Sequence, residues 1–556
     1  AHPVFFYGQD YMGALQAYLA APVFAVLGPT TFALHVTTTV QFALFALVLY
    51  AFTRAVYSPK VAWLTIALLA LGPSEAFFLE LRAGAGIQDT LFFGTLLFWL
   101  AFLRLQRPGG RLKRALLDAG LGLTAGLGVW ADLLILPFLL AAGLALAGDM
   151  LWRLRGATSR QRVSEAASQL LTLAPGFGLA CAPFIAANIA SRGATFARTL
   201  SIAGTGSTAG GHAGIADRLI ALGDQVAVTL FLGLPHALGS AFVCVNCATW
   251  PTPRRSVPLG EALHSALISA PFSLVALAFW ALAAVLVARE VWQSARGTRL
   301  GIGLPSATSQ YDARWWGRAM LIISATLTVV AYMASHVAYF YPGTDRYLAG
   351  IYVSTPLVAE PLYQGGALAW RWIAAQHWLA GIPQRPPAAA FLAAALLVAL
   401  FGLDVAAIRS TFLATDDRQV YGVPAGTQDR QLVSFLHTHH AASFYTTYWV
   451  CDRLMFESAE ETRCAVVKDG DIFSPGLNRV SGNWAALRAM PHPAYVFDTQ
   501  TEGGLPIAEH QVAALFAAGD SRFTGYVTAQ IAGYVTYYYD HVDIALRVPL
   551  RRATDP

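Results

Sequence analysis

The feature that most constrains this chain is a series of long apolar runs separated by short polar stretches. The runs are roughly 18 to 25 residues long, the length at which an α-helix crosses the ~30 Å hydrocarbon layer of a bilayer. Hydrophobic residues make up 56% of the sequence and charged residues only 12%, about half the charged fraction of an average soluble domain. We therefore expect a polytopic α-helical membrane protein, because helices satisfy their own backbone hydrogen bonds in lipid.

Hydropathy predicts about ten transmembrane helices before the composition changes near residue 410. The predicted spans are 30–53, 60–75, 88–105, 114–130, 133–151, 168–190, 263–288, 319–338, 347–369 and 386–409. Beyond them, QDRQLVSFLHTHH and IAEHQVAALFAAGD have helical periodicity, whereas ASFYTTYWV and HPAYVFD are typical of strands. The expected organisation is a transmembrane domain over 1–410 followed by a soluble α/β domain over 411–556.

The basic residues set the expected orientation in the membrane. The net charge of +5 comes almost wholly from arginine, and most arginines of the membrane domain fall in one set of loops, which the positive-inside rule assigns to the cytoplasm. The opposite loops are 1–29, 76–87, 190–262 and 338–346. We expect a multi-pass protein of the plasma (inner) membrane of a bacterium, with an extracytoplasmic C-terminal domain, membrane lipids as neighbours and no nucleic-acid partner.

Four of the five cysteines form close pairs on the expected outer side, Cys244 with Cys247 and Cys451 with Cys464. Disulfides persist in oxidising compartments outside the cytoplasm. Cys451 and Cys464 flank DRLMFESAEETR, and two strands joined by a turn would bring them within bonding distance. We predict a disulfide there. Zinc is not expected at CVNC, because no second Cys/His pair lies nearby.

Three clusters of polar residues lie near the outer ends of predicted spans, where an unpaired charge is costly. They comprise Gln9, Asp10 and Tyr11; Glu80, Arg82 and Asp89; and His336, Arg346 and Tyr347. Each cluster has a simple structural interpretation: an aromatic belt with a helix cap at Asp10, a cap at Asp89, and an anchor in which Arg346 pairs with Asp345. The functional alternative is one outward cavity in which carboxylates and a guanidinium serve proton transfer, a metal or a phosphate.

Two further acids, Asp132 and Asp404, also lie near outer span ends. They are isolated from other polar groups in the sequence, so we expect them to be structural. The sequence carries no Walker loop, HExxH zinc helix or GxSxG nucleophile elbow. The functional candidates are therefore the three clusters.

Taken in order, three segments resemble the GT-C superfamily of membrane glycosyltransferases. HPVFFYGQDYMGALQAYLAAPVFAVLGPTTFALH is similar to the segment after that family's catalytic loop, and FLELRAGAGIQDTLFFGTLLFWLAFLRL to its second outer loop and following span, where an acid recurs at the position of Asp89. DRYLAGIYVSTPLV resembles its late span beginning with RY. The resemblance covers roughly residues 1 to 410 and favours the glycosyltransferase 39-like group, which includes protein mannosyltransferases and the lipid A aminoarabinose transferase.

The resemblance implies inverting transfer of a sugar from a polyprenyl-phosphate donor to a lipid, glycan or protein acceptor at the outer membrane face. The catalytic candidates are Asp89 and Asp10, and the substrate-binding candidates are Gln9, Tyr11, Glu80, Arg82, His336, Arg346 and Tyr347. No cofactor is assigned, and a divalent cation is left open. The family's general base lies upstream of the FFYGQDYMG segment, so it would precede Ala1. We expect an N-terminally truncated piece, and its activity is in question.

Two other classes of membrane protein share parts of this pattern. A lipid or polysaccharide flippase would need charged residues along a path through the membrane, whereas these acids gather at one face. An O-antigen ligase or polymerase would carry its chemistry in a large outer loop, and the segment 190–262 is long but poor in charge. Both classes remain alternatives to the transferase.

Overall fold

The computed structural model describes residues 3–7, 9–70, 72, 86–106, 109–154, 158–197, 215–238, 259–299, 313–335, 337–338, 344–374, 425–468, 470–499 and 507–540. The chain divides into two compact units. The membrane unit consists of residues 1–6, 10–28 and 32–408, and the C-terminal unit consists mainly of residues 409–556, with 7–9 and 29–31. Each unit is described by itself.

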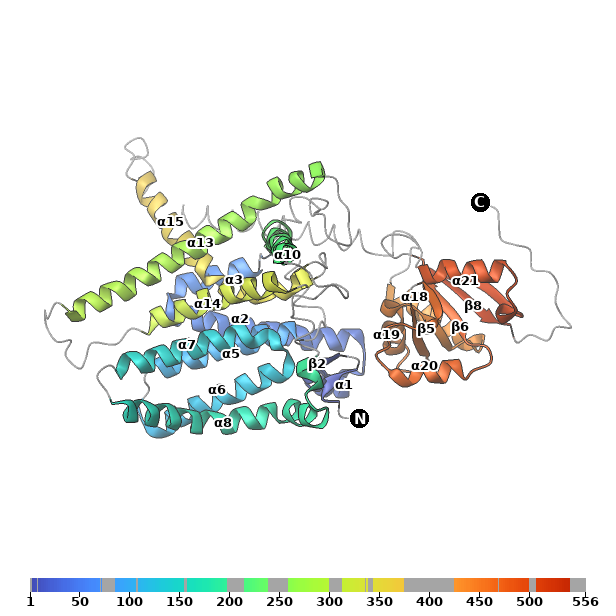
Figure 1. Cartoon of the computed structure of the whole chain (residues 1–556), viewed down its shortest axis with the longest axis horizontal. Helices are drawn as coiled ribbons and strands as arrows, with labels where there is room; N and C mark the ends of the chain where they lie inside the picture. Colours follow the sequence, from blue (N-terminus) through green and yellow to red (C-terminus); the bar gives the residue numbers. More distant parts are fainter. Residues whose placement is uncertain are drawn as a thin grey trace. The chain divides into compact units, whose positions relative to one another are not determined.

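The membrane unit is built of long apolar helices, most of which run lengthwise in Figure 1. They are α2 (Thr31–Val56), α5 (Ile87–Leu105), α6 (Arg111–Ala131), α7 (Leu136–Arg153), α8 (Ser159–Ala190), α13 (Leu259–Arg299), α14 (Arg314–Ala334) and α15 (Pro356–Ala374), with the shorter α3 (Pro59–Ala70). Within the described residues, seven helical stretches are long and apolar enough to cross a bilayer. The chain is a polytopic helical membrane protein, as its apolar runs predict. The predicted span 386–409 lies outside the described residues.

The predicted span 347–369 has a different local structure at its start. It begins as a 3-10 helix, η4 (Asp345–Ser354), and becomes α-helical only in α15. Pro356 begins α15, and proline suits the first position of an α-helix because its missing N–H would have no partner there. A 3-10 helix of 10 residues is unusually long, since runs beyond three or four residues are uncommon. It therefore depends on tertiary contacts.

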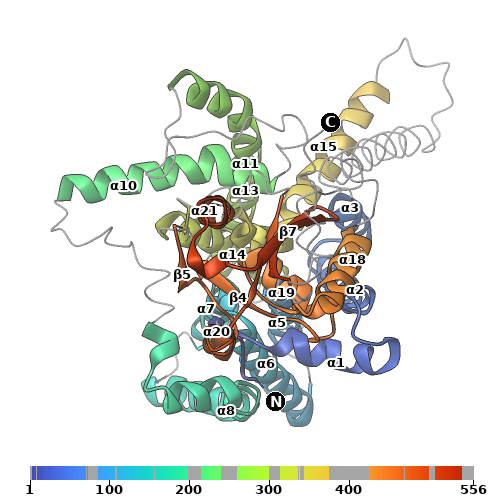
Figure 2. The ribbon, with the colours of Figure 1, turned by 90° about the vertical axis from the view of Figure 1, so that its right-hand side faces the viewer.

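The segment 190–262, expected to be one outer loop, contains a continuous helical run. This run consists of α10 (Ile215–Val228), a π-helical turn η2 (Thr229–Gly233) and α11 (Leu234–Ala237), and residues 219–237 are long and apolar enough to span a bilayer. Figure 1 looks almost along α10, whereas Figure 2, turned by 90°, shows it lengthwise. The helix thus lies across the bundle. The sequence prediction missed it because Asp224 and Gln225 interrupt its apolar pattern.

Glycines allow α6 and α8 to approach closely. A Cβ atom at Gly126 of α6 would lie 2.6 Å from the carbonyl oxygen of Phe177, and one at Gly176 of α8 would lie 2.5 Å from that of Ala119. Gly122 and Gly126 are four residues apart on the same face of α6. This is the spacing of small residues at which membrane helices pack backbone to backbone.

A buried ion pair joins α5 to α6. The Nε atom of Arg104 lies 2.9 Å from Oδ1 of Asp118, and the hydroxyl of Thr172 on α8 donates to Oδ2 of Asp118 at 3.2 Å. Charges within apolar helices are costly unless they are paired. Arg104 and Asp118 therefore compensate each other's charge inside the bundle, and the pair has a structural role.

The N-terminal end of the membrane unit carries two short strands and a short helix. β1 (Phe5–Phe6) and β2 (Gln9–Gly13) form a two-stranded sheet, and α1 (Leu15–Leu27) follows. At 1.5 Å per residue, the 13 residues of α1 are too few to span the hydrocarbon layer. The indole Nε1 of Trp130, at the end of α6, donates to the carbonyl oxygen of Val4 at 2.9 Å. This bond ties the N-terminal strands to the helix bundle.

The C-terminal unit is a three-layer α/β domain, which confirms the fold class expected from the sequence. Its sheet has the order β5-β4-β3-β6-β8-β7, in which β3 is parallel to β4 and β6, and the other pairs are antiparallel. Helices α18 and α19 cover one face of the sheet and α20 and α21 the other. The strands are β3 (Ser443–Thr446), β4 (Arg463–Lys468), β5 (Asp471–Pro475), β6 (Ala494–Asp498), β7 (Tyr526–Ile531) and β8 (Tyr534–Tyr539); the helices are α18 (Ala425–Thr438), α19 (Tyr448–Glu457), α20 (Ser481–Arg488) and α21 (Ile507–Ala517).

The predicted disulfide between Cys451 and Cys464 is present, with a Cα–Cα distance of 5.5 Å. The local structure expected for it is wrong, because the bond joins helix α19 to strand β4 and not two strands. The predicted strand in ASFYTTYWV ends at Thr446, and Tyr448 already begins α19. Cys181 is a buried free thiol, and Cys244 and Cys247 lie outside the described residues.

Candidate active site

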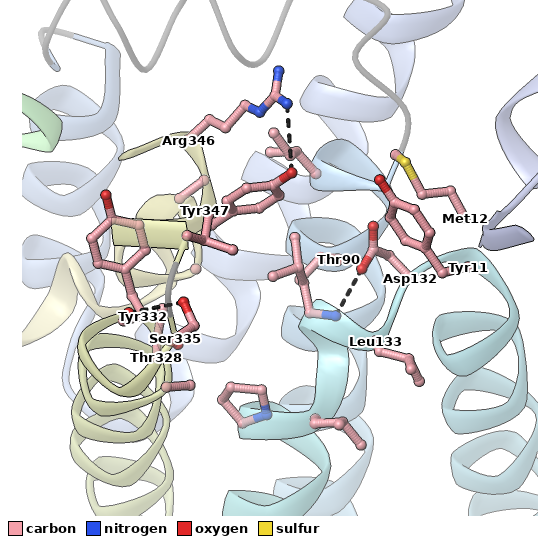
Figure 3. A pocket seen from close by; sticks show the side chains of 18 residues that line it. Tyr11, Met12, Thr90, Asp132, Leu133, Thr328, Tyr332, Ser335, Arg346 and Tyr347 are labelled. Carbon is pink, nitrogen blue, oxygen red and sulfur yellow. Dashed lines mark hydrogen bonds between the residues drawn. The ribbon is translucent and has the colours of Figure 1, made fainter. Parts of the chain in front are cut away.

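A cavity of about 260 Å³ opens between η4, the end of α14, the start of α7 and strand β2 (Figure 3). Most of its lining side chains are apolar, such as Ile87, Leu134 and Val337. Its polar lining side chains are Tyr11, Thr90, Asp132, Thr328, Tyr332, Ser335, Arg346 and Tyr347. All of these residues belong to the membrane unit.

The cationic group of the cavity comes from η4. The guanidinium carbon of Arg346 lies 5.3 Å from the centre of the Tyr347 ring, and its Nη2 lies 3.5 Å from the Tyr347 hydroxyl. In Figure 3, Arg346 and Tyr347 enter from one side of the cavity, and Tyr11, Met12 and Asp132 from the other. Within the described residues, Arg346 forms no ion pair with a carboxylate. The interpretation in which it pairs with Asp345 is therefore wrong.

The carboxylate of the cavity belongs to Asp132, between α6 and α7. Asp132 is 7% exposed, and its Oδ1 accepts a hydrogen bond of 2.9 Å from the backbone N–H of Leu134, which caps the short 3-10 helix η1 (Leu133–Ile135). Gly86, which has a positive φ of 82°, packs against this carboxylate, and any Cβ there would collide with it. Asp132 thus has the structural role expected of it, and it also lines the cavity.

Asp89 lies behind the cavity wall. It is in the first turn of α5, its side chain is fully buried, and it accepts a hydrogen bond from the amide of Gln41 on α2. Its neighbours Ile87 and Thr90 line the cavity, whereas Asp89 does not. Gly86, three residues before Asp89, packs against the Asp132 carboxylate, so the two acids lie near one another. Asp89 can therefore influence the cavity electrostatically without facing it.

The structure brings together only part of the predicted site. Tyr11, Arg346 and Tyr347 line one cavity although they come from two distant segments, and Gln9 is not among the lining residues. Asp10 is in β2, which also carries Tyr11. Three predicted site residues and one predicted structural acid lie outside the described residues; they are Glu80, Arg82, His336 and Asp404.

The sequence reasoning missed several lining residues. No other polar residue is close to Asp132 in the sequence, and this isolation predicts only a structural role. The signal that marks it as a site candidate is its place directly between two predicted spans. Tyr332, Thr328 and Ser335 lie in or just after an apolar span, and no sequence signal separates them from other helix residues. In the part of the chain that the structure describes, no three His, Cys, Asp or Glu side chains form a metal-binding group.

Comparisons with known proteins find similar solved structures. No protein-family model and no curated protein matches the sequence. The chain is similar to the structure of ArnT from Cupriavidus metallidurans bound to undecaprenyl phosphate, at 11% identity and a TM-score of 0.49, over 96% of this chain and 88% of ArnT. It is also similar to ArnT from the same organism in the apo state, at 10% identity and a TM-score of 0.38, over the same shares of the two chains.

Proposed function

We propose that this chain is a membrane glycosyltransferase that moves a sugar from a polyprenyl-phosphate donor to an acceptor at the outer face of the membrane, with inversion. The observation that carries the proposal is the make-up of one cavity, in which Arg346 and Asp132 lie within mostly apolar walls. A lipid-linked sugar phosphate has matching parts: an apolar chain, an anionic phosphate and a sugar. The resemblance of residues 1 to 410 to GT-C transferases supports the same reading.

Arg346 is proposed to hold the phosphate of the donor. A guanidinium can donate two parallel hydrogen bonds to phosphate oxygens, and such charge-assisted bonds are stronger than neutral ones. When the bond between the sugar and the phosphate breaks, the phosphate leaves with the electron pair and gains negative charge. A cation already in place stabilises that charge without reorganising. The Tyr347 ring beside the guanidinium helps to fix its position.

Asp132 is proposed to act on the acceptor. In an inverting transfer the acceptor oxygen attacks the anomeric carbon from the side opposite the phosphate and loses its proton to a base. The Asp132 carboxylate can take that proton. If an upstream acid is the base, as the family resemblance implies, Asp132 instead orients the acceptor hydroxyl. In both cases Asp89 lies behind the wall, in the same turn of α5 as Gly86, which packs against the Asp132 carboxylate.

The C-terminal domain is proposed to lie outside the cytoplasm. The Cys451–Cys464 disulfide supports this placement, because disulfides persist in oxidising compartments. The arginine-rich loops of the membrane unit favour the same orientation. A role for this domain in selecting a lipid, glycan or protein acceptor is part of the proposal.

Binding of undecaprenyl phosphate to the purified chain in nanodiscs tests the donor side. Arg346→Ala should raise the dissociation constant about tenfold or more, or ~1.4 kcal/mol. Arg346→Lys should give a smaller loss, because lysine keeps the charge and lacks the planar fork. Arg111→Ala, at the exposed start of α6, is the matched control and should bind like the wild type. Wild-type affinity in Arg346→Ala would contradict the proposal.

A transfer assay tests the acceptor side and separates a transferase from a flippase. In a form of the protein that releases sugar from a polyprenyl-phosphate donor, Asp132→Asn should lower turnover and leave undecaprenyl phosphate binding nearly unchanged. The asparagine keeps the cap on η1, since its side-chain oxygen still accepts the Leu134 N–H. A flippase would instead move labelled lipid across the bilayer with no sugar release. That result would replace the transferase with the alternative.

A further inference from the structure

A π-helical turn places α11 beside the cavity. The turn η2 interrupts the helical run that begins with α10 and ends with α11, which contains His236. Single π-turns within α-helices are rare and occur frequently at functional sites. At Gly233, the last residue of the turn, a Cβ atom would lie 3.2 Å from Cε1 of Tyr332, one of the cavity-lining residues. The turn thus brings the backbone before α11 against the cavity wall.

His236 contacts the residue next to the proposed phosphate-binding arginine. Its Nδ1 lies 2.6 Å from Oδ2 of Asp345, whose side chain is 1% exposed. A second bond joins the same two elements, because the hydroxyl of Tyr352 donates to the carbonyl oxygen of Ala237 at 3.0 Å. α11 is therefore attached to the first residue of η4 and to a residue near its end. These contacts help to stabilise the long 3-10 helix η4.

The direction in which the Asp345 carboxylate points determines whether it pairs with the guanidinium of Arg346. In the sequence these two residues are adjacent, and an acid beside an arginine at a membrane face would be expected to pair with it. In the structure the Asp345 carboxylate faces His236 while Arg346 lies along the Tyr347 ring. An arginine that is paired with a carboxylate binds a phosphate more weakly, since the two anions compete for the same N–H donors.

We propose that His236 is a positioning residue that engages the Asp345 carboxylate and so keeps the guanidinium of Arg346 available for the phosphate of a lipid-linked ligand. The inference rests on the proposed function. His236 does not touch the ligand and acts only through Asp345. Without the imidazole, the buried carboxylate loses a partner and turns toward the adjacent guanidinium, which is the nearest strong donor along the chain. Arg346 is then partly neutralised and drawn away from the ligand.

A rescue experiment tests whether His236 acts on lipid-phosphate binding through the Asp345 charge. Binding of undecaprenyl phosphate is measured on the whole chain in nanodiscs, with inorganic phosphate as a competitor that tells a lipid headgroup site from a free-phosphate site. His236→Ala should raise the dissociation constant about tenfold. His236→Ala combined with Asp345→Asn should return it to within about twofold of the wild type, because the competing charge is gone. His264→Ala, an exposed histidine on α13, is the control and should not change affinity.

The outcomes distinguish the inference from the function on which it rests. A double variant that binds as weakly as His236→Ala overturns the inference, since the weak binding then does not come from the Asp345 charge. Wild-type affinity in His236→Ala overturns it as well. If the wild type binds no undecaprenyl phosphate and Arg346→Ala changes nothing, the proposed donor site itself fails, and the inference fails with it. If inorganic phosphate displaces the lipid completely at equal concentration, the site recognises free phosphate and not a lipid-linked ligand.

Discussion

Gln41 on α2 donates its side-chain N–H to the carboxylate of Asp89 on α5, and both side chains are buried. The contact joins two helices that are far apart in the sequence. A buried carboxylate is costly unless it is hydrogen-bonded. The glutamine therefore stabilises an acid that lies directly behind the wall of the cavity.

Removing Gln41 should destabilise the membrane unit. Gln41→Leu leaves the Asp89 carboxylate buried without its amide donor, and the expected loss is about 1–3 kcal/mol. Gln41→Leu combined with Asp89→Leu removes both polar groups and should recover much of that loss. Thermal unfolding in detergent, monitored by size-exclusion chromatography, measures the stability of the single and the double variant. Equal stability of the wild type and Gln41→Leu would show that the hydrogen bond contributes nothing.

Close packing of α6 on α8 predicts a strong effect of a single methyl group. Gly126→Ala would place a Cβ 2.6 Å from the Phe177 carbonyl oxygen, so the helices must separate. Overpacking of this kind costs about 1–3 kcal/mol. Gly143→Ala on α7, where no atom lies within 4 Å of the added Cβ, is the matched control. The two variants should differ in melting temperature, and identical values would refute close packing at Gly126.

Reducing the Cys451–Cys464 disulfide should loosen the C-terminal domain. The bond closes a loop with a sequence separation of 13, and a loop of about 15 residues corresponds to ~3 kcal/mol in the chain-entropy model. Hydrogen exchange in peptides from α19 and β4 should accelerate in Cys451→Ser/Cys464→Ser. Intact mass before and after reduction and alkylation shows whether the bond forms. Two freely alkylated thiols in the unreduced protein would rule it out.

The C-terminal domain should respond to pH through Asp429. Burial raises the pKa of Asp429 above its usual value of 3.8, although Arg453 Nε at 3.2 Å and the Tyr534 hydroxyl at 2.5 Å favour the charged form. The folded state then holds this proton more tightly than the unfolded state. Its contribution to stability is fully present below pH 3.8 and is lost as the pH rises through the raised value.

Asp429→Asn isolates this effect, because asparagine does not titrate. Amide exchange in β8, corrected for its intrinsic pH dependence, should be slowest at acidic pH in the wild type and should vary less with pH in the variant. The difference between the two proteins removes the contribution of other acids. A wild-type profile parallel to that of Asp429→Asn would contradict the assignment.

Accessibility of single cysteines tests the orientation of the chain. In a background with Cys244 and Cys247 replaced by serine, His510→Cys should react with a membrane-impermeant maleimide added from outside, since the His510 side chain is 67% exposed. Arg111→Cys, at the exposed start of α6, should react only after the membrane is opened. Labelling of Arg111→Cys from outside would reverse the proposed topology.

The sequence by itself determined the fold class and much of the C-terminal domain. The apolar runs that became α2, α5 and α7 could be recognised because the bilayer imposes a length on any helix that crosses it. Strand β6 and helix α21 follow from local periodicity, and a short sequence separation favoured the Cys451–Cys464 bond. These features depend on nearby residues, so a one-dimensional pattern contains them.

The tertiary structure alone decided which polar groups share the cavity and what each one contacts. Asp132 was an isolated acid in the sequence, and it lines the same cavity as Arg346 only because the turn before α7 packs close to η4. Sequence adjacency allowed a pair between Asp345 and Arg346, whereas the Asp345 carboxylate contacts His236, which comes from a segment expected to be a loop. The physical reason is that a buried charge is costly unless a partner lies within contact distance. The packing of helices that are distant in the sequence determines which partners lie that close.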